Sequence, residues 1–139
     1  MEESVRIRAE YGILQLAYIG DAVMELYVRE RLLVCNGQYP TGKLSRMAKA
    51  FVSCEAQSDA VGRIEADFTE EEASIFRRGR NAKTKHTPSH GDPIQYKRAT
   101  GLEALFGYLF LTGRDARARE LFEKAFPSDD TAAALSPSV

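Results

Sequence analysis

The sequence contains no tryptophan, only two cysteines and no apolar run long enough to cross a membrane. Cys35 and Cys54 stand far apart and without the spacing of metal ligands, which excludes a disulfide-rich secreted fold. The most apolar run, residues 102 to 111, is about half the length that spans a bilayer, and the N-terminus lacks an apolar signal segment. We therefore expect a protein of the reducing cytoplasm with no membrane-spanning segment.

The patterns of several enzyme classes are also missing. The sequence has no glycine-rich phosphate loop, no Gly-x-Ser-x-Gly elbow and no Cys and His pair at a spacing suited to nucleophilic catalysis. His86 and His90 are four residues apart, but the prolines and the glycine around them indicate a loop, where helical spacing has no meaning. A zinc site at these histidines is therefore disfavoured.

What remains is the composition of an ordinary globular protein, with 44% hydrophobic and 28% charged residues among 139. This length suits one domain. Apolar residues recur at helical spacing almost throughout, and no run alternates with a period of two, so the pattern predicts an all-α fold. We expect a single domain over residues 1–127 and a disordered tail over residues 128–139.

The periodicity and the capping signals also predict where the helices lie. The first should be a central buried helix that ends at Asn36-Gly37. Ser53 is placed to cap the third, and Thr69 opens a capping box for the fourth. A long exposed loop is expected over residues 81–93. The expected helices cover residues 13–33, 43–52, 54–67, 70–80, 95–111 and 114–126.

Two acids interrupt otherwise apolar helices. Asp21 lies in the run from residue 16 to residue 24, and Glu103 is the only charge between residues 102 and 111. Burying such an acid is costly unless a partner outside its helix compensates. Gly20 costs its helix roughly 1 kcal/mol relative to alanine, which close approach of another helix or of a ligand phosphate would explain. Glu25, one turn from Asp21, is either a supporting group or a salt-bridged surface residue.

Each acid has an ordinary alternative, because it could face solvent or pair internally with an arginine. If the two helices cross at Asp21 and Glu103, the pair would instead form an oxygen-rich site suited to Mg²⁺. A strongly basic segment lies between these acids, with one acidic residue, Asp92, in its midst. This segment could be a solvated helix end, or it could hold a phosphate backbone, with neutral hydrogen-bonding side chains assisting. The residues of this segment that could bind such a backbone are Arg77, Arg78, Arg80, Asn81, Lys83, Lys85, Lys97 and Arg98.

Three blocks of the sequence resemble the catalytic domain of the ribonuclease III family, and more closely its Mini-III subgroup. They are Leu-Ala-Tyr-Ile-Gly-Asp-Ala-Val at residues 16–23, Arg-Arg-Gly-Arg-Asn-Ala-Lys at residues 77–83, and Glu-Ala-Leu-Phe-Gly-Tyr-Leu-Phe-Leu at residues 103–111. The resemblance covers most of the chain, from Ile13 to about Phe126. Where the wider family carries two further acids this sequence has Ala17 and Thr100, which suits the Mini-III pattern and leaves two acids per subunit.

The resemblance implies a homodimeric, Mg²⁺-dependent endoribonuclease with a ribonuclease III-like helical fold. It implies that Asp21 and Glu103 are the catalytic, metal-binding residues. It further implies that the enzyme cleaves double-stranded RNA in maturing the 5′ and 3′ ends of the 23S rRNA precursor, with a large-subunit ribosomal protein as a possible partner on the substrate. The sequence leaves two alternatives open. One is an inert double-stranded-RNA-binding or ribosome-associated module of the same fold, and the other is a helical bundle with no nucleic-acid role.

Overall fold

The computed structural model describes residues 11–83 and 91–127, and these ranges are helical with no strand. The helices fall in the expected order, which confirms the all-α prediction. None of the helices in the described ranges is long and apolar enough to cross a membrane. The elements are α2 (Ile13–Asn36), α3 (Thr41–Val52), α4 (Cys54–Ile64), the 3₁₀ turn η1 (Glu65–Asp67), α5 (Glu70–Arg80), α6 (Pro93–Leu111) and α7 (Asp115–Ala125).

The predicted capping signals work as expected. Ser53 caps α4 because its hydroxyl accepts a hydrogen bond from the Ala56 N–H at 3.1 Å. At the start of α5, Thr69 accepts from the Glu72 N–H at 3.1 Å, and Glu72 accepts from the Thr69 N–H at 3.0 Å. Helix α6, expected from residue 95, starts two residues earlier, because Asp92 caps it and Pro93 occupies its first turn.

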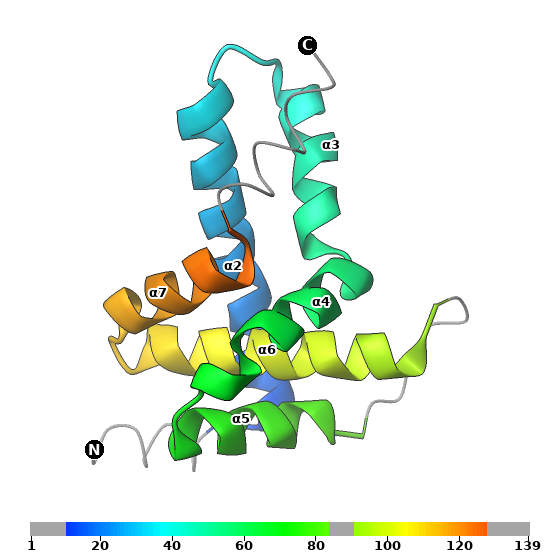
Figure 1. Cartoon of the computed structure of the whole chain (residues 1–139), viewed down its shortest axis with the longest axis vertical. Helices are drawn as coiled ribbons and strands as arrows, with labels where there is room; N and C mark the ends of the chain where they lie inside the picture. Colours follow the sequence, from blue (N-terminus) through cyan, green and yellow to red (C-terminus); the bar gives the residue numbers. More distant parts are fainter. Residues whose placement is uncertain (1–10, 84–90, 128–139) are drawn as a thin grey trace.

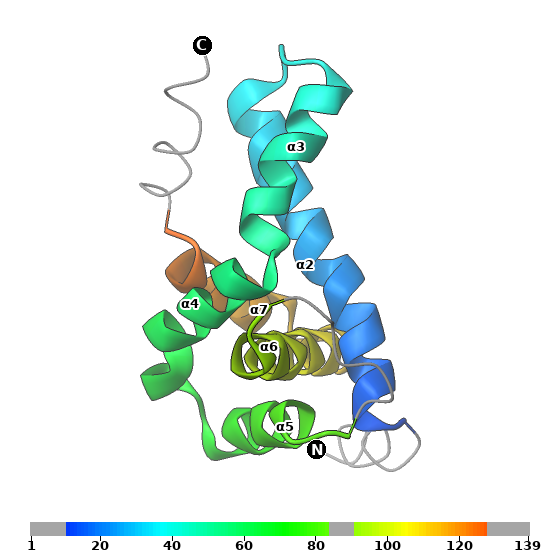
Figure 2. The same ribbon diagram turned by 90° about the vertical axis from the view of Figure 1, so that its right-hand side faces the viewer.

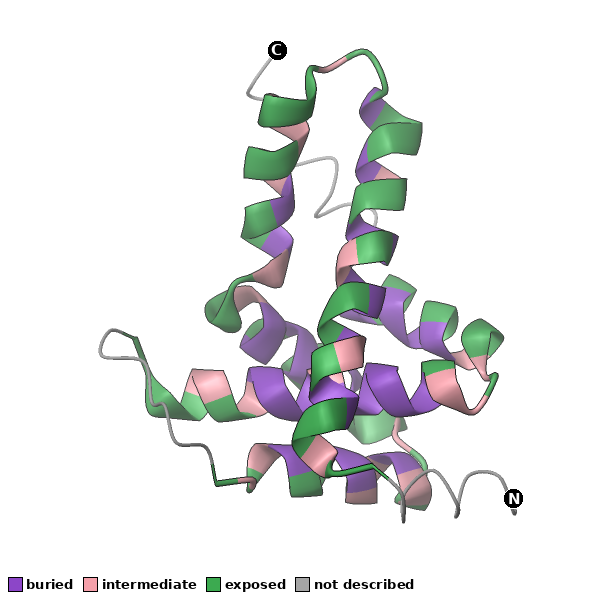
Figure 3. Ribbon diagram, turned by 180° about the vertical axis from the view of Figure 1, so that it is seen from behind, coloured by how far each residue is buried: buried purple, intermediate pink, exposed green. Residues whose placement is uncertain are grey.

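Helix α6 is the centre of the fold. It contacts α2, α4, α5 and α7, and a view along its axis shows α2 on one side, α4 on the other and α5 beneath (Figure 2). Figure 1 shows α2 and α3 standing as an upright pair in the upper part of the molecule, with α4 below α3, while α5 and α6 lie across the lower part. Every residue of α6 from Ala99 to Leu109 except Glu103 is buried, so this helix forms the core (Figure 3).

The prediction that the first helix is a central buried helix holds for only one of its sides. The buried side of α2 packs on α6, but another side leaves large apolar residues exposed, among them Tyr18 with 83% of its surface accessible. Sequence hydrophobicity does not distinguish a face that packs within the chain from one that is covered by another molecule. The exposed apolar residues on this face are Leu14, Tyr18, Leu26 and Leu33.

The expected loop over residues 81–93 is only partly described. Residues 81–83 follow α5 without helical structure, and the expected tail over residues 128–139 lies outside the described residues, as do His86, His90 and Lys85. Cys35 and Cys54 are both free and exposed.

Candidate active site at the crossing of α2 and α6

Helices α2 and α6 cross with their backbones in contact at Gly20 and Gly107. An ideal Cβ placed on Gly20 would lie 1.6 Å from the Glu103 carbonyl oxygen, and one on Gly107 would lie 1.9 Å from the Leu16 carbonyl oxygen. Neither position has room for a side chain. The sequence allowed two explanations for Gly20, close approach of another helix or of a ligand phosphate. The structure shows the first, because α6 packs against this glycine.

This crossing brings the two predicted catalytic acids together. The side chains of Asp21 and Glu103 lie within hydrogen-bonding range of each other. Burial, followed by the charge of Asp21, raises the pKa of Glu103 from 4.5 to about 8. Two carboxylates this close repel each other, so a cation between them would stabilise the doubly ionised pair.

Asp21 is exposed, so the expectation that it is a buried acid in an apolar helix is wrong. It belongs to the solvent-facing side of α2, and Glu103, half-buried on α6, is the acid that bears the desolvation penalty. The pair is therefore open to solvent on the Asp21 side. Glu25, one turn away, accepts a hydrogen bond from Arg29 at 2.8 Å and forms an i,i+4 ion pair with it, so its carboxylate has a partner on its own helix.

A third polar group at the site, Gln57, was not identified from the sequence. Its amide nitrogen donates to the Val52 carbonyl at 3.0 Å and to Glu103 Oε2 at 3.4 Å. The signal was present, because Gln57 occupies the same helical stripe as the buried Ala60, Val61 and Ile64 of α4. A buried glutamine in an otherwise apolar stripe needs a hydrogen-bond partner in the core, so its position indicates one.

The candidate RNA-binding residues divide into two groups. Arg77, Arg78 and Lys83 are exposed and close to the end of α5. A second set lines a surface hollow of about 270 Å³ at the N-terminal part of α6, together with Glu65, Phe76 and Ile94. The structure thus brings four predicted residues to one hollow, namely Arg80, Asn81, Lys97 and Arg98.

Two of these arginines also contribute to the fold. Arg98 is half-buried and donates from Nη2 to the Ser58 carbonyl of α4 at 3.0 Å. The Arg80 guanidinium lies 5.9 Å from the centre of the Phe76 ring and donates to Asn81 Oδ1 at 3.2 Å. Substituting either arginine would therefore affect packing as well as charge.

Comparison with known proteins agrees with this geometry. The ribonuclease III domain family matches residues 14–114. A Mini-ribonuclease 3 from Symbiobacterium thermophilum is 43% identical over 81% of this chain and 85% of its own length. One from Enterococcus faecalis is 44% identical over 78% of this chain and 83% of its own length. The chain belongs to the ribonuclease III family.

A solved structure supports the fold assignment within this family. A protein from Fusobacterium nucleatum, whose crystal structure is known, superposes with a TM-score of 0.73 at 31% identity, covering 81% of this chain and 91% of that one. The match to Mini-ribonuclease 3 proteins, combined with the domain match, makes this chain an endoribonuclease of the ribonuclease III type. The inert module and the bundle without a nucleic-acid role are therefore set aside.

Ala17 and Thr100, the two positions at which resemblance to the wider family would lead one to expect further acids, are buried and carry no carboxylate. Ala17 is buried on α2, and the Thr100 hydroxyl donates to the Tyr96 carbonyl of its own helix at 3.0 Å. Within the described ranges, no three or more histidine, cysteine, aspartate or glutamate side chains come together as a metal site. A structural zinc site needs four such ligands, whereas Mg²⁺ is commonly held by one or two carboxylates, water and substrate phosphate. The donor set of Asp21 and Glu103 therefore fits Mg²⁺.

Proposed function

We propose that this enzyme hydrolyses phosphodiester bonds of double-stranded RNA in the cytoplasm and uses Mg²⁺ held by Asp21 and Glu103. The observation that supports the proposal most directly is the α2–α6 crossing, which brings the two carboxyl groups within interacting range of each other. Mg²⁺ at this position would lower the pKa of water and neutralise charge on the phosphate. The exposed position of Asp21 leaves the site open to a large substrate.

The basic residues supply the binding surface of this proposal. Lys97 and Glu103 are on the same helix, about 9 Å apart along its axis. Gly101, between them, packs against Phe76 of α5, whereas Glu103 faces α2, so the hollow and the acids are on different sides of α6. A duplex that contacts both must cover a wide surface. Double-stranded RNA suits this arrangement because proteins recognise its shape and its phosphates across the wide minor groove.

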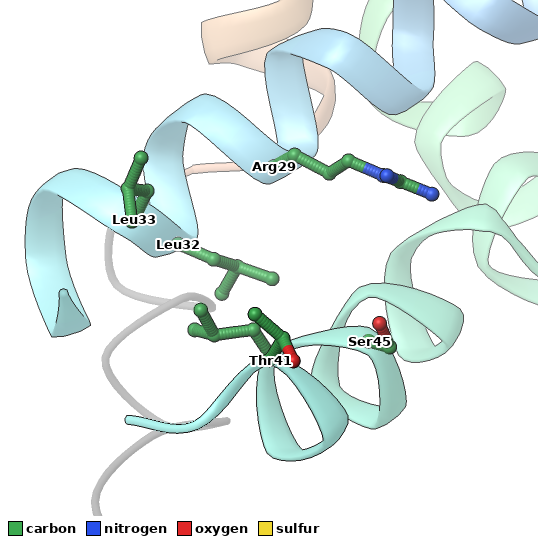
Figure 4. A pocket seen from close by; sticks show the side chains of 6 residues that line it. Arg29, Leu32, Leu33, Thr41 and Ser45 are labelled. Carbon is green, nitrogen blue, oxygen red and sulfur yellow. The ribbon is translucent and has the colours of Figure 1, made fainter. Parts of the chain in front are cut away.

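We further propose that the enzyme acts as a homodimer through the exposed apolar face of α2. The positions of Leu14, Tyr18, Leu26 and Leu33 on the helical wheel fall within about a third of a turn of one another. The face continues into a hollow of about 200 Å³ between α2 and α3, where Leu32 and Leu33 lie opposite Thr41 and Ser45 (Figure 4). A second copy of the chain would cover this apolar surface and place one site on each strand of a duplex.

Cleavage of a labelled RNA duplex tests the site. Wild-type protein should cut with Mg²⁺, EDTA should stop the cutting, and Asp21→Asn should abolish it while RNA binding persists. Glu25→Gln is the matched control, since it removes a carboxylate one turn away whose partner is Arg29. Undiminished cutting by Asp21→Asn would contradict the assigned site, and binding without cutting by the wild type would favour an inert module.

The natural substrate is proposed from the relatedness to Mini-ribonuclease 3 proteins. We propose that the enzyme matures both ends of the 23S rRNA precursor. A duplex formed from the 5′ and 3′ flanks of that precursor should be cut faster and at fewer positions than an unrelated duplex of the same length. Repeating the assay with a large-subunit ribosomal protein bound to the duplex tests whether that partner directs cleavage. Equal rates and random positions on the two duplexes would contradict this substrate.

A further inference from the structure

Gln57 is almost completely buried, with 2% of its surface accessible, at the junction between α3 and α4. Its amide nitrogen carries two hydrogens and points them at two acceptors, the Val52 carbonyl at the end of α3 and Glu103 Oε2 on α6. The side chain thus connects a catalytic acid to the backbone of a neighbouring helix. Among the described residues outside α2, no other side chain donates a hydrogen bond to Glu103.

The side-chain amide oxygen of Gln57 has no hydrogen-bond partner among the described residues. This atom, Oε1, is also buried. Leaving a buried acceptor unsatisfied costs about 1 to 3 kcal/mol, so a glutamine in this apolar stripe needs a compensating role.

We propose that Gln57 is a positioning residue for the metal site, one that holds the Glu103 carboxylate toward Asp21. The proposal rests on the metal site put forward under the proposed function. A donor that fixes one carboxylate oxygen leaves the other free for the cation. Groups that orient a metal ligand in this way commonly change metal affinity 10- to 100-fold when they are removed.

A structural role alone is the competing explanation, because Gln57 also satisfies the last carbonyl of α3. A comparison of two variants distinguishes the positioning role from the structural role. Gln57→Met keeps the length and volume of the side chain but donates no hydrogen bond. Ser53→Ala is the matched control, since it removes the cap of α4 at the same junction and does not touch Glu103.

Two measurements on the full chain test the proposal. Gln57→Met should raise the Mg²⁺ concentration for half-maximal cutting at least tenfold, and it should shrink the rise in Tm that Mg²⁺ or Mn²⁺ produces without RNA. Ser53→Ala should lower Tm in the absence of metal and leave both metal dependences unchanged. Equal metal dependence in Gln57→Met and wild type, or an equal change in Ser53→Ala, would overturn the positioning role.

The variant Asp21→Asn distinguishes a wrong role for Gln57 from a wrong metal site. If Asp21→Asn keeps the full metal-induced rise in Tm, the proposed metal site is wrong, and the role of Gln57 falls with it. If Asp21→Asn loses that rise and Gln57→Met retains it, the site stands and only the positioning role is overturned.

A measurement on the wild type covers the case in which Gln57→Met does not fold. The side-chain amide resonances of Gln57 should shift during a Mg²⁺ titration in step with metal binding, while those of the exposed Gln38 should not. The shift should disappear in Asp21→Asn. A Gln57 resonance that stays in place while Mg²⁺ binds would equally overturn the proposal.

Discussion

Gly20 packs directly on the carbonyl group of Glu103, so the backbone of α2 touches the backbone of α6 at the residue that carries the half-buried acid of the pair. This contact couples the fold to the site. The separation of the two helices sets the separation of Asp21 and Glu103, and a methyl group at residue 20 cannot be accommodated without moving one helix.

Gly20→Ala should therefore destabilise the protein by several kcal/mol and abolish cleavage, although alanine is the better helix former by roughly 1 kcal/mol. Thermal unfolding and the duplex assay measure the two effects. Gly62→Ala is the control, because its added Cβ would meet only the Arg98 side chain at the ordinary contact distance of 3.8 Å. That variant should be as stable as the wild type or slightly more stable, and a Gly20→Ala protein of normal Tm would contradict the crossing.

The pairing of Asp21 with Glu103 could be predicted because both acids stand in apolar helices beside glycines. What the sequence could not show was which acid is buried, since this depends on how α2 turns relative to α6. The exposed face of α2 was misjudged for a related reason, because Tyr18 and Leu26 are as apolar as core residues. Arg98 was predicted from its charge alone, and its bond to the Ser58 carbonyl depends on how α4 packs.

The ion pair between Glu72 and Arg117 should make stability depend on acid pH. Both carboxylate oxygens of Glu72 accept from Arg117, at 2.8 and 2.9 Å, and Glu72 also caps α5. Burial raises the pKa of Glu72, but the hydrogen bonds from Arg117 and Thr69 outweigh it, so the pKa is lowered from 4.5. The stabilisation is therefore complete above about pH 4.5 and is lost as the pH falls through the lowered value.

Glu72→Gln should cost about 2 to 3 kcal/mol at neutral pH, since it removes the buried carboxylate from Arg117 and leaves that guanidinium only the exposed carboxylate of Glu120. The difference in Tm between wild type and Glu72→Gln, measured from pH 7 to pH 3, should be constant down to about pH 5 and become smaller below it. Glu55→Gln, an exposed acid in the first turn of α4, is the control and should show little gap at any pH. A Glu72→Gln gap that widens in acid would contradict the lowered pKa.

Replacing Arg78, Arg80 and Lys83 with alanine should weaken duplex binding and flatten its dependence on salt. Each lost phosphate contact removes roughly one unit from the slope of log affinity against log salt concentration. The slope is measured by titrating a labelled duplex in metal-free buffer at several salt concentrations. Arg46 and Lys49, exposed on α3, provide a control pair whose replacement should leave the slope unchanged. An unchanged slope in the triple variant would remove these residues from the RNA surface.

The exposed face of α2 should determine the oligomeric state. Wild-type protein should sediment at about twice the 15.5 kDa mass of one chain. Leu26→Glu combined with Leu33→Glu should convert it to monomers, because two carboxylates per chain would be buried without partners in a symmetric interface. Both positions are more than a turn from Asp21, so the monomer should still bind Mn²⁺, which the rise in Tm reports.

Val34→Glu distinguishes a specific interface from general surface hydrophobicity. Val34 is 80% exposed, more so than Leu26 or Leu33, but it points to a different side of α2, toward the hollow that Tyr27 and Arg119 line. This variant should remain a dimer of normal mass. If Val34→Glu dissociates the protein as readily as the double variant, or if the double variant stays dimeric, the interface lies elsewhere. Loss of duplex cutting in a folded monomer that still binds metal would show that the enzyme needs two sites on one duplex.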